Sequence, residues 1–178
     1  MSDQTYDWLA KTTADGTSTS ITIDSISQEY KCLVATADMK TASSSSGISF
    51  SFKLNGQTGS NYSYIVSYGT SSGNYFTGNE NSATGVVNYS NGTSSGNTSS
   101  TGENGMVWAW IPYYSEAGIA KMIGGYSVGA GSSSSNLYHS RFGLTYKGLT
   151  DKVTSLSWCQ DNGSNITYGC EFNIWGLR

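Results

Sequence analysis

The chain has 178 residues, of which 12% are charged and 13% aromatic, and its formal net charge at pH 7 is −3. So few charges exclude coiled coils and solvated helical bundles, and 13 Tyr with 5 Trp exclude an intrinsically disordered chain. Nine scattered basic residues cannot neutralise a run of phosphates, so we expect no nucleic-acid partner. No apolar run approaches the ~20 residues of a membrane span, and the first residues resemble no signal peptide, so we expect no membrane insertion.

Alternating apolar and polar residues predict short strands along most of the chain. In the clearest run, Ile48–Leu54, every second residue is apolar, and the turn pair Asn55-Gly56 follows it. Helical periodicity is nearly absent, with at most one turn over Ser115–Met122. The predicted strands are, in chain order, Ser20–Ile26, Tyr30–Ala37, Ile48–Leu54, Asn61–Tyr68, Gly85–Tyr89, Met106–Ile111, Met122–Val128, Tyr138–Tyr146, Val153–Cys159 and Tyr168–Leu177.

Short strands at this spacing, separated by Ser-, Gly- and Asn-rich turns, are typical of one compact β architecture. We expect an all-β fold with essentially no helix, an antiparallel β-sandwich of jelly-roll type with about 8–10 strands. We predict a short N-terminal arm over residues 1–17 and a single domain over residues 18–178. The low-complexity segment Ser90–Gly105 is expected to be a long exposed loop, either a partner contact or a mobile connector.

Two predicted strands depart from alternation. Met106–Ile111 is apolar on both faces, and Cys170–Leu177 is so in part. A strand with two apolar faces lies either at the centre of a sandwich or under a neighbouring subunit. The sequence leaves both interpretations open.

The three cysteines offer no recognisable motif. Cys32, Cys159 and Cys170 are an odd number, and no Cys-x-x-Cys pair or nearby histidine suggests a metal site. We expect all three to be small buried side chains. The alternative is a Cys159–Cys170 disulfide, since these two residues flank a predicted turn.

No arrangement of residues indicates catalysis. His139 is the only histidine, and the alternating segment around it puts His139 and Arg141 on one strand face, opposite Tyr138, Ser140 and Phe142. The chain has no Gly-x-Ser-x-Gly nucleophile motif and no His-Glu-x-x-His or EF-hand pattern. We therefore expect no catalytic residues, no metal site and no cofactor, and we do not expect an enzyme.

Two aromatic pairs lie in segments rich in Gly, Ser and Asn. These are Tyr75-Phe76 and Tyr113-Tyr114. Rigid aromatic faces stack on sugar rings or anchor protein partners, so Tyr75, Phe76, Tyr113 and Tyr114 are candidate loop contacts. The alternative is that they complete the core at strand ends.

The order of these features resembles a family of tailed-phage virion structural proteins from aquatic phages, cyanophage-like in character. The likeness covers nearly the whole chain, from Tyr6–Thr13 (YDWLAKTT) and Ser18–Ile26 (STSITIDSI) through Phe50–Gly56 (FSFKLNG) to Cys170–Arg178 (CEFNIWGLR). Departures are Ser27 where the family has Pro, Gln57 where it has Asp, and a closing Trp-Gly-Leu-Arg in place of Tyr-Gly-Ile-Lys. The resemblance implies a jelly-roll protein of the virion that is usually a homotrimer and has no known catalytic position.

The resemblance leaves open whether the protein decorates the capsid or belongs to a tail. Because the chain is short and its domain begins almost at Met1, without a long attachment shaft, we expect a capsid decoration (cement) protein. It would be made in the host cytoplasm, be displayed on the particle exterior, and bind the major capsid protein lattice as a homotrimer. Tyr6, Trp8 and Leu9 in the arm are the candidate anchors on the capsid or on a neighbouring subunit. The alternative is a receptor-binding or tail-tip module that holds host surface glycans through the loop aromatics.

Overall fold

The computed structural model describes residues 5–38, 40, 50–57, 62–70, 73–83, 86–88, 105–130, 137–146, 151–160 and 163–178. The ordered elements in these ranges are all β-strands, and none of these residues is helical. The strands are β1 (Tyr6–Thr13), β2 (Ser20–Ile23), β3 (Cys32–Asp38), β4 (Phe50–Leu54), β5 (Tyr62–Thr70), β6 (Gly73–Ala83), β7 (Val86–Asn88), β8 (Met106–Pro112), β9 (Lys121–Ala130), β10 (Leu137–Tyr146), β11 (Leu156–Gln160) and β12 (Glu171–Leu177).

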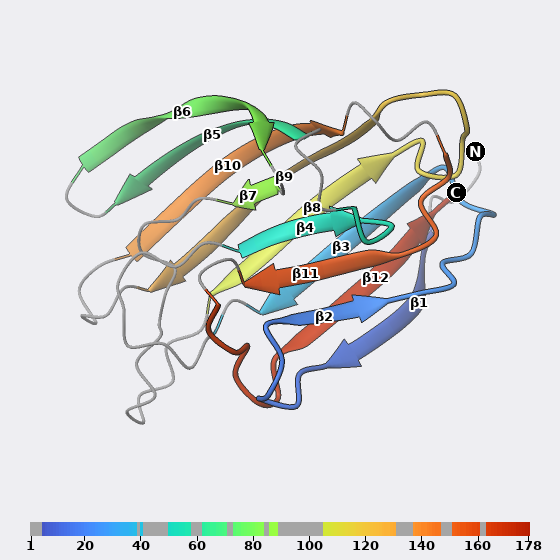
Figure 1. Cartoon of the computed structure of the whole chain (residues 1–178), viewed down its shortest axis with the longest axis horizontal. Helices are drawn as coiled ribbons and strands as arrows, with labels where there is room; N and C mark the ends of the chain where they lie inside the picture. The colour runs from blue at the N-terminus through green and yellow to red at the C-terminus, as the bar shows by residue number, and fades with distance from the viewer. Residues whose placement is uncertain are drawn as a thin grey trace.

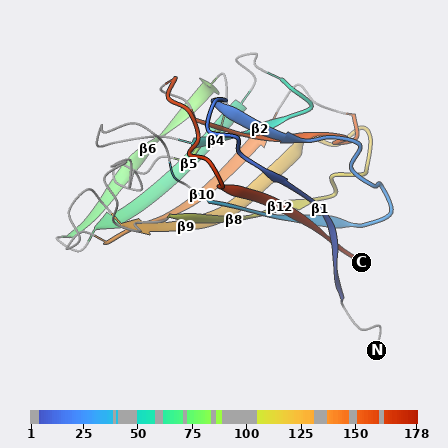
Figure 2. The same cartoon turned by 90° about the horizontal axis from the view of Figure 1, so that it is seen from below.

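The strands form two antiparallel sheets packed face to face (Figure 1). The large sheet has the order β1-β12-β3-β8-β9-β10-β5-β6, and the small sheet has the order β2-β11-β4-β7. Figure 2 shows the two layers nearly edge-on, with β2 and β4 on one side of the large sheet. The chain is therefore an antiparallel β-sandwich, as the sequence predicts.

The strand order is that of a jelly roll with two added hairpins. Without those hairpins the two sheets have the orders β1-β12-β3-β8 and β2-β11-β4-β7, which is the eight-stranded jelly-roll pattern. The hairpins β5-β6 and β9-β10 are insertions, and both join the large sheet beyond β8. They extend that sheet from four strands to eight.

The core lies between the sheets because each strand turns its apolar face inward. Strand β11 is buried along its whole length between β2 and β4. Its Trp158 is fully buried, stacks on Phe50 at 5.0 Å between ring centroids, and contacts Phe52 at 4.7 Å. Phe142 and Phe172 of the large sheet each lie 6.3 Å from the Phe52 ring. These aromatic pairs join the two sheets.

The prediction of an arm over residues 1–17 is wrong for its central part. Residues Tyr6–Thr13 form β1, an edge strand paired with β12 from Tyr6↔Leu177 to Thr13↔Glu171. A bulge between Trp8 and Ala10 interrupts the alternation that marks a strand in sequence. This irregularity explains why the segment does not look like a strand.

The sequence does not predict strand β6, and residues Ser115–Met122 contain no helical turn. Tyr75 and Phe76 lie within β6 rather than in a loop. The chain between β8 and β9 forms turns and bends. The loop prediction for Ser90–Gly105 lies outside the described residues, except at Gly105.

The predictions for the cysteines and for the Asn55-Gly56 turn agree better with the structure. Cys159 and Cys170 are both free and buried, so the alternative of a disulfide between them is wrong. Cys32 is free and only partly buried. Asn55 and Gly56 have φ of 48° and 66°, and the Gln57 N–H donates to the Leu54 carbonyl at 2.9 Å, as in a type I′ turn.

Candidate functional site

The side of the large sheet that faces away from the small sheet, here called the outer face, carries an unusual number of large apolar side chains. In β8, Val107, Ala109 and Ile111 point into the core, while Met106 and Trp110 are exposed. Strand β8 is therefore central in its sheet, but only one of its apolar faces is covered by the sandwich. This arrangement explains why Met106–Ile111 looks apolar on both faces.

Three aromatic rings on β8 and β9 form a cluster on the outer face. The centroids of Trp108 and Trp110 lie 5.5 Å apart, and Tyr126 lies 6.0 Å from Trp108 and 6.4 Å from Trp110. Trp110 and Tyr126 are each 39% exposed. Exposed aromatic groups of this size are typical of surfaces that contact a partner.

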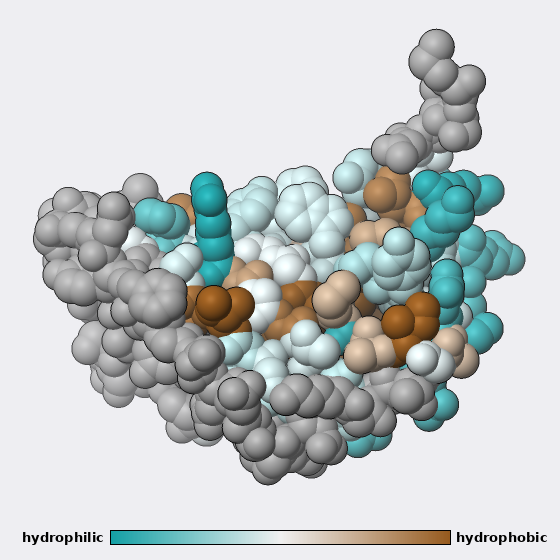
Figure 3. Space-filling view, turned by 90° about the horizontal axis from the view of Figure 1, so that it is seen from above, coloured by the Kyte–Doolittle hydropathy of each residue, from teal (hydrophilic) through white to brown (hydrophobic). Residues whose placement is uncertain are grey.

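Next to this cluster the outer face is hollowed into a trough of about 560 Å³. Gly124 of β9 and Gly143 of β10 are paired partners and leave its centre without side chains. Its lining includes Thr145 and Ser63, whose Oγ is itself buried, and no lining residue is charged. Figure 3, which looks onto the edge where β8 ends and β9 begins, shows brown apolar residues exposed among paler ones. The apolar side chains that bound the trough are Trp110, Pro112, Met122 and Ile65.

The turn after β8 is held firmly at the end of this trough. Tyr113 has a φ of 53°, its N–H donates to the Lys31 carbonyl at 2.8 Å, and its side chain is 55% exposed. Lys121 is buried beneath the turn and donates to the carbonyls of Glu116 and, at 3.4 Å, Tyr113. Burial lowers the pKa of Lys121. The turn thus presents Tyr113 to solvent in a fixed position.

The three candidate anchors lie on β1 at the edge of the large sheet. Tyr6 and Trp8 are 52% and 61% exposed, whereas Leu9 is partly buried and packs against the core. A hydrogen bond from Tyr30 and the Arg178 guanidinium, 3.0 Å away, lower the pKa of Asp7 beside them. Tyr6 and Trp8 are therefore available for contact with a partner, while Leu9 contributes to packing of the core.

The four loop aromatics do not form one site. Tyr113 is exposed, but Tyr114 is wrong as a contact candidate because it is fully buried and its hydroxyl donates to the Ser27 carbonyl. Tyr75 and Phe76 lie on β6, which β9, β10 and β5 separate from β8 in the sheet. Tyr114 instead completes the core, the alternative that the sequence left open.

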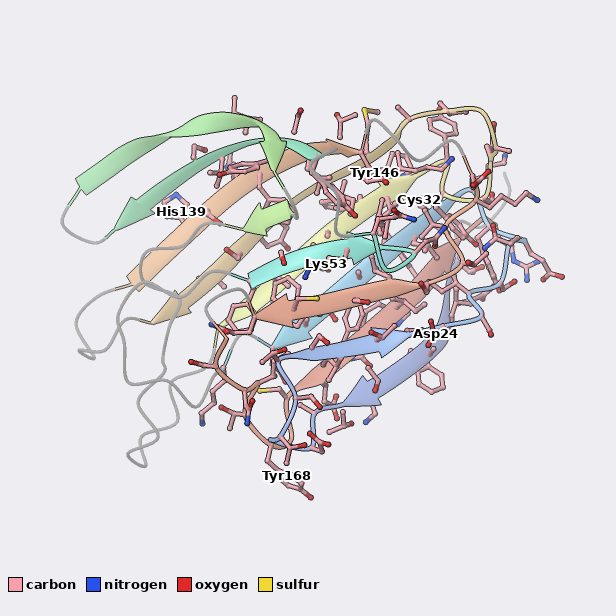
Figure 4. All side chains as sticks on the ribbon, viewed as in Figure 1. Asp24, Cys32, Lys53, His139, Tyr146 and Tyr168 are labelled. Carbon is pink, nitrogen blue, oxygen red and sulfur yellow. The ribbon has the colours of Figure 1, made fainter. Side chains whose placement is uncertain are left out.

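His139 and Arg141 are both exposed on β10, while Ser140 and Phe142 are buried, as the alternation predicts (Figure 4). Within the described ranges, no three His, Cys, Asp or Glu side chains gather as metal ligands do. The described part of the chain also contains no helix long and apolar enough to cross a membrane.

The trough and the aromatic cluster were not predicted as a site. The available signal was glycine inside predicted strands, at Gly124 and Gly143, where a residue without a side chain often marks close approach of another group. Which strand would lie beside them depends on long-range pairing that the pattern does not reveal.

Comparisons with known proteins add little to this description. No family model and no curated protein matches the chain. One solved structure with some likeness is galectin LEC-6 of Caenorhabditis elegans, with 11% identity over 94% of this chain and 95% of that chain, and a TM-score of 0.34. A likeness of this strength supports no statement about function.

Proposed function

We propose that this chain is a virion structural protein that decorates a phage capsid, binding the assembled lattice of the major capsid protein as a homotrimer. The observation that carries the proposal is the exposed aromatic outer face of the large sheet, which continues to Tyr6 and Trp8 on edge strand β1. Such a surface suits attachment to another protein. The capsid as partner rests on the sequence resemblance.

The proposed mechanism is stabilisation by mass action. A protein that binds the assembled lattice and not its free subunits favours the assembled state in proportion to its occupancy. On β1, Trp8 is the most exposed large side chain, and Trp is the residue type most enriched among interface hot spots. We therefore assign the main capsid contact to Trp8, supported by Tyr6.

The test measures binding of the purified protein to capsids from which it has been removed. Because a hot-spot side chain contributes about 2 kcal/mol or more, Trp8→Ala should weaken binding roughly 30-fold or more. The control is Tyr168→Ala, which removes an 80% exposed ring at the lower edge of Figure 4, in the turn before β12. Both variants should keep the wild-type melting temperature. Wild-type affinity of the Trp8→Ala protein would show that β1 does not attach the chain.

The fixed, exposed Tyr113 favours a second function, a receptor-binding or tail-tip module that holds host surface glycans. The backbone of this tyrosine is hydrogen-bonded to Lys31 and Lys121, and its exposed ring offers a flat face on which a sugar ring can stack. Glycan-array binding lost in Tyr113→Ala would support this function. Hundreds of copies per virion without any glycan signal would support decoration instead, and a handful of copies would place the chain on the tail.

A further inference from the structure

The outer face is organised as one row of directly opposed residues across the large sheet. Trp8 on β1 faces Trp175 on β12, and from there each strand adds the residue paired with the one before. Because paired residues in an antiparallel sheet share a face, these side chains lie side by side. The row continues through Trp175, Val34, Trp110, Gly124, Gly143 and Ile65.

The row has two halves of opposite shape. From β12 to β8 it carries large side chains, and Val34, which is only 2% exposed, lies between the paired positions of Trp175 and Trp110. Trp8, on the edge strand β1, stands beyond this half at the end of the row. From β9 to β10 it carries no side chain at all, which leaves the trough. One face of the same molecule therefore presents both a tryptophan-bearing half and a hollow half.

The fold itself does not require glycine at Gly124 or Gly143. A Cβ added at Gly124 would lie no closer than 3.9 Å to any atom, and one at Gly143 would lie 3.7 Å from Ile65 Cγ2, both ordinary contacts. Neither residue has the positive φ that favours glycine. At Gly125, by contrast, a Cβ would overlap the Trp108 carbonyl and lie 2.7 Å from the Phe142 ring. Glycine weakens a strand, so its use at 124 and 143 is explained by what lies above them.

The chemistry of the trough fits an apolar side chain better than a sugar or an ion. Its walls are aromatic and aliphatic, its small polar residues are Ser63 and Thr145, and no lining residue is charged. Sugar sites add amide or charged side chains that fix the hydroxyls of the ring, and ion sites need charge. The occupant we look for is therefore an apolar group carried by a protein.

We propose that a second copy of this chain fills the trough, with the tryptophan-bearing half of one copy, centred on Trp175, packed against Gly124 and Gly143 of the next. The proposal rests on the proposed homotrimer, in which such a head-to-tail contact repeats around the three-fold axis. Every copy offers both halves, so each gives one contact and receives one.

The charges around the two halves agree with this occupant. The charges near the tryptophan-bearing half are paired within the copy, Lys11 with Glu171 at 2.7 Å and Asp7 with Arg178 at 3.0 Å, so that half brings little net charge to the uncharged trough.

The test fills the trough and measures the oligomer by sedimentation velocity. Gly143→Val and Gly124→Val add bulk at positions where the fold has room, so both proteins should stay folded and sediment as monomers. Trp175→Ala, which removes the central side chain of the tryptophan-bearing half, should also stay folded and sediment as a monomer. The control is Ser20→Val, which places the same valine side chain at an exposed position on β2 in the small sheet and should remain oligomeric.

Mixing the variants makes the test specific. Trp175→Ala keeps its trough, and Gly143→Val keeps its tryptophan-bearing half, so the two together restore one contact. We expect the mixture to sediment as a one-to-one dimer although each protein alone is monomeric. A monomeric wild type, or an oligomer that survives Gly143→Val and Trp175→Ala, would overturn the proposal.

These outcomes separate this proposal from the proposed function. Loss of capsid binding in Trp8→Ala with an intact oligomer tests the capsid contact alone. A wild-type dimer that Gly143→Val dissociates would support the trough contact while contradicting the three-fold arrangement. A monomer that still binds capsids would overturn the trough contact and leave decoration standing.

Discussion

Tyr62 shows how a single buried hydroxyl ties an inserted hairpin to the jelly roll. It lies at the start of β5, with its ring 4.5 Å from the Tyr146 ring on β10. Its hydroxyl accepts from the Leu54 N–H at 3.1 Å and donates to the Gln57 carbonyl at 3.3 Å. One side chain thus links the large sheet to the turn that follows β4 in the small sheet.

This environment makes the stability of the protein sensitive to alkaline pH. Burial raises the pKa of Tyr62 from 10.0 to about 12, and burial likewise raises the pKa of Cys170 to about 11. An acid whose pKa is raised in the folded state contributes fully below its unfolded pKa, and the contribution is lost as pH rises through the folded pKa. The free energy of unfolding should therefore fall between about pH 9 and pH 12, with Tyr62 contributing at most roughly 3 kcal/mol.

Urea titrations at pH 8 and pH 11.5 measure this effect. Tyr62→Phe should be less stable at pH 8 by about 1–2 kcal/mol, because the Leu54 N–H loses its acceptor, but should lose less stability on going to pH 11.5. Tyr113→Phe, at an exposed position, should behave as wild type. Equal alkaline losses in wild type and Tyr62→Phe would contradict the assignment to Tyr62.

At the scale of the element, the turn after β4 determines how two segments distant in sequence meet. The Asn55 side chain accepts from the N–H groups of Thr154 at 2.8 Å and Ser155 at 3.0 Å, and donates to the Lys152 carbonyl at 2.8 Å. It therefore fixes the chain that enters β11, besides adopting the positive φ of the turn. The sequence alone predicts the positive φ of Asn55 but not its hydrogen bonds to the chain before β11.

Replacing Asn55 should separate these two roles. Asn55→Gly keeps the conformational freedom that the turn requires but removes three hydrogen bonds, while Asn55→Ala also strains the backbone. We expect Asn55→Ala to lower the free energy of unfolding by about 2–4 kcal/mol and Asn55→Gly by about 1 kcal/mol less than that. Thermal or urea unfolding measures both. Equal losses would mean that the positive φ carries no cost.

The strands that the sequence predicts and those that it misses differ in one respect. Ile48–Leu54 alternates without interruption, and β4 follows it with every inward residue buried. Strand β1 is an edge strand with a bulge, and its residues alternate between exposed and only partly buried. Strand β6 pairs with β5 through two irregularities in register. Bulges break the period of two on which strand prediction depends.

At the scale of the whole molecule, the first and last strands, β1 and β12, lie side by side at one edge of the large sheet. Their pairing joins Tyr6 to Leu177, and the exposed ion pairs Lys11–Glu171 and Asp7–Arg178 span the same strands. Exposed pairs of this kind contribute little to stability. The contribution of β1 therefore comes from its backbone hydrogen bonds and from Leu9 and Ala10, which pack on the core.

Removal of residues 1–13 should accordingly destabilise the whole sandwich. The truncation uncovers the edge of β12 and the core beneath Leu9, so we expect the melting temperature to fall by about 10 °C or more and aggregation to increase. The control truncation of residues 1–5 leaves β1 complete and should melt as wild type. An unchanged melting temperature without residues 1–13 would mean that the segment acts only as an arm.

Of the outer face, only Tyr6 and Trp8 are candidates that the sequence offers, and the sequence predicts neither the trough nor the aromatic cluster. The exposure of Tyr6 and Trp8 agrees with their choice as anchors, whereas Tyr114 enters the core and Leu9 packs beneath β1. Trp175, Trp110 and Gly143 become neighbours on one row only because β12, β3, β8, β9 and β10 lie next to each other in the sheet. No local pattern in the chain specifies that order.

By itself the sequence determined the class of the fold. Few charges, regular alternation and Gly-, Ser- and Asn-rich turns leave an antiparallel β-sandwich as the way to bury the apolar residues, because alternation is a local consequence of strand geometry. Only the tertiary structure decided which face of β8 meets the core and which remains exposed beside Gly124. That choice depends on pairing between strands far apart in the chain, where the free energy of burial, and not local propensity, selects the register.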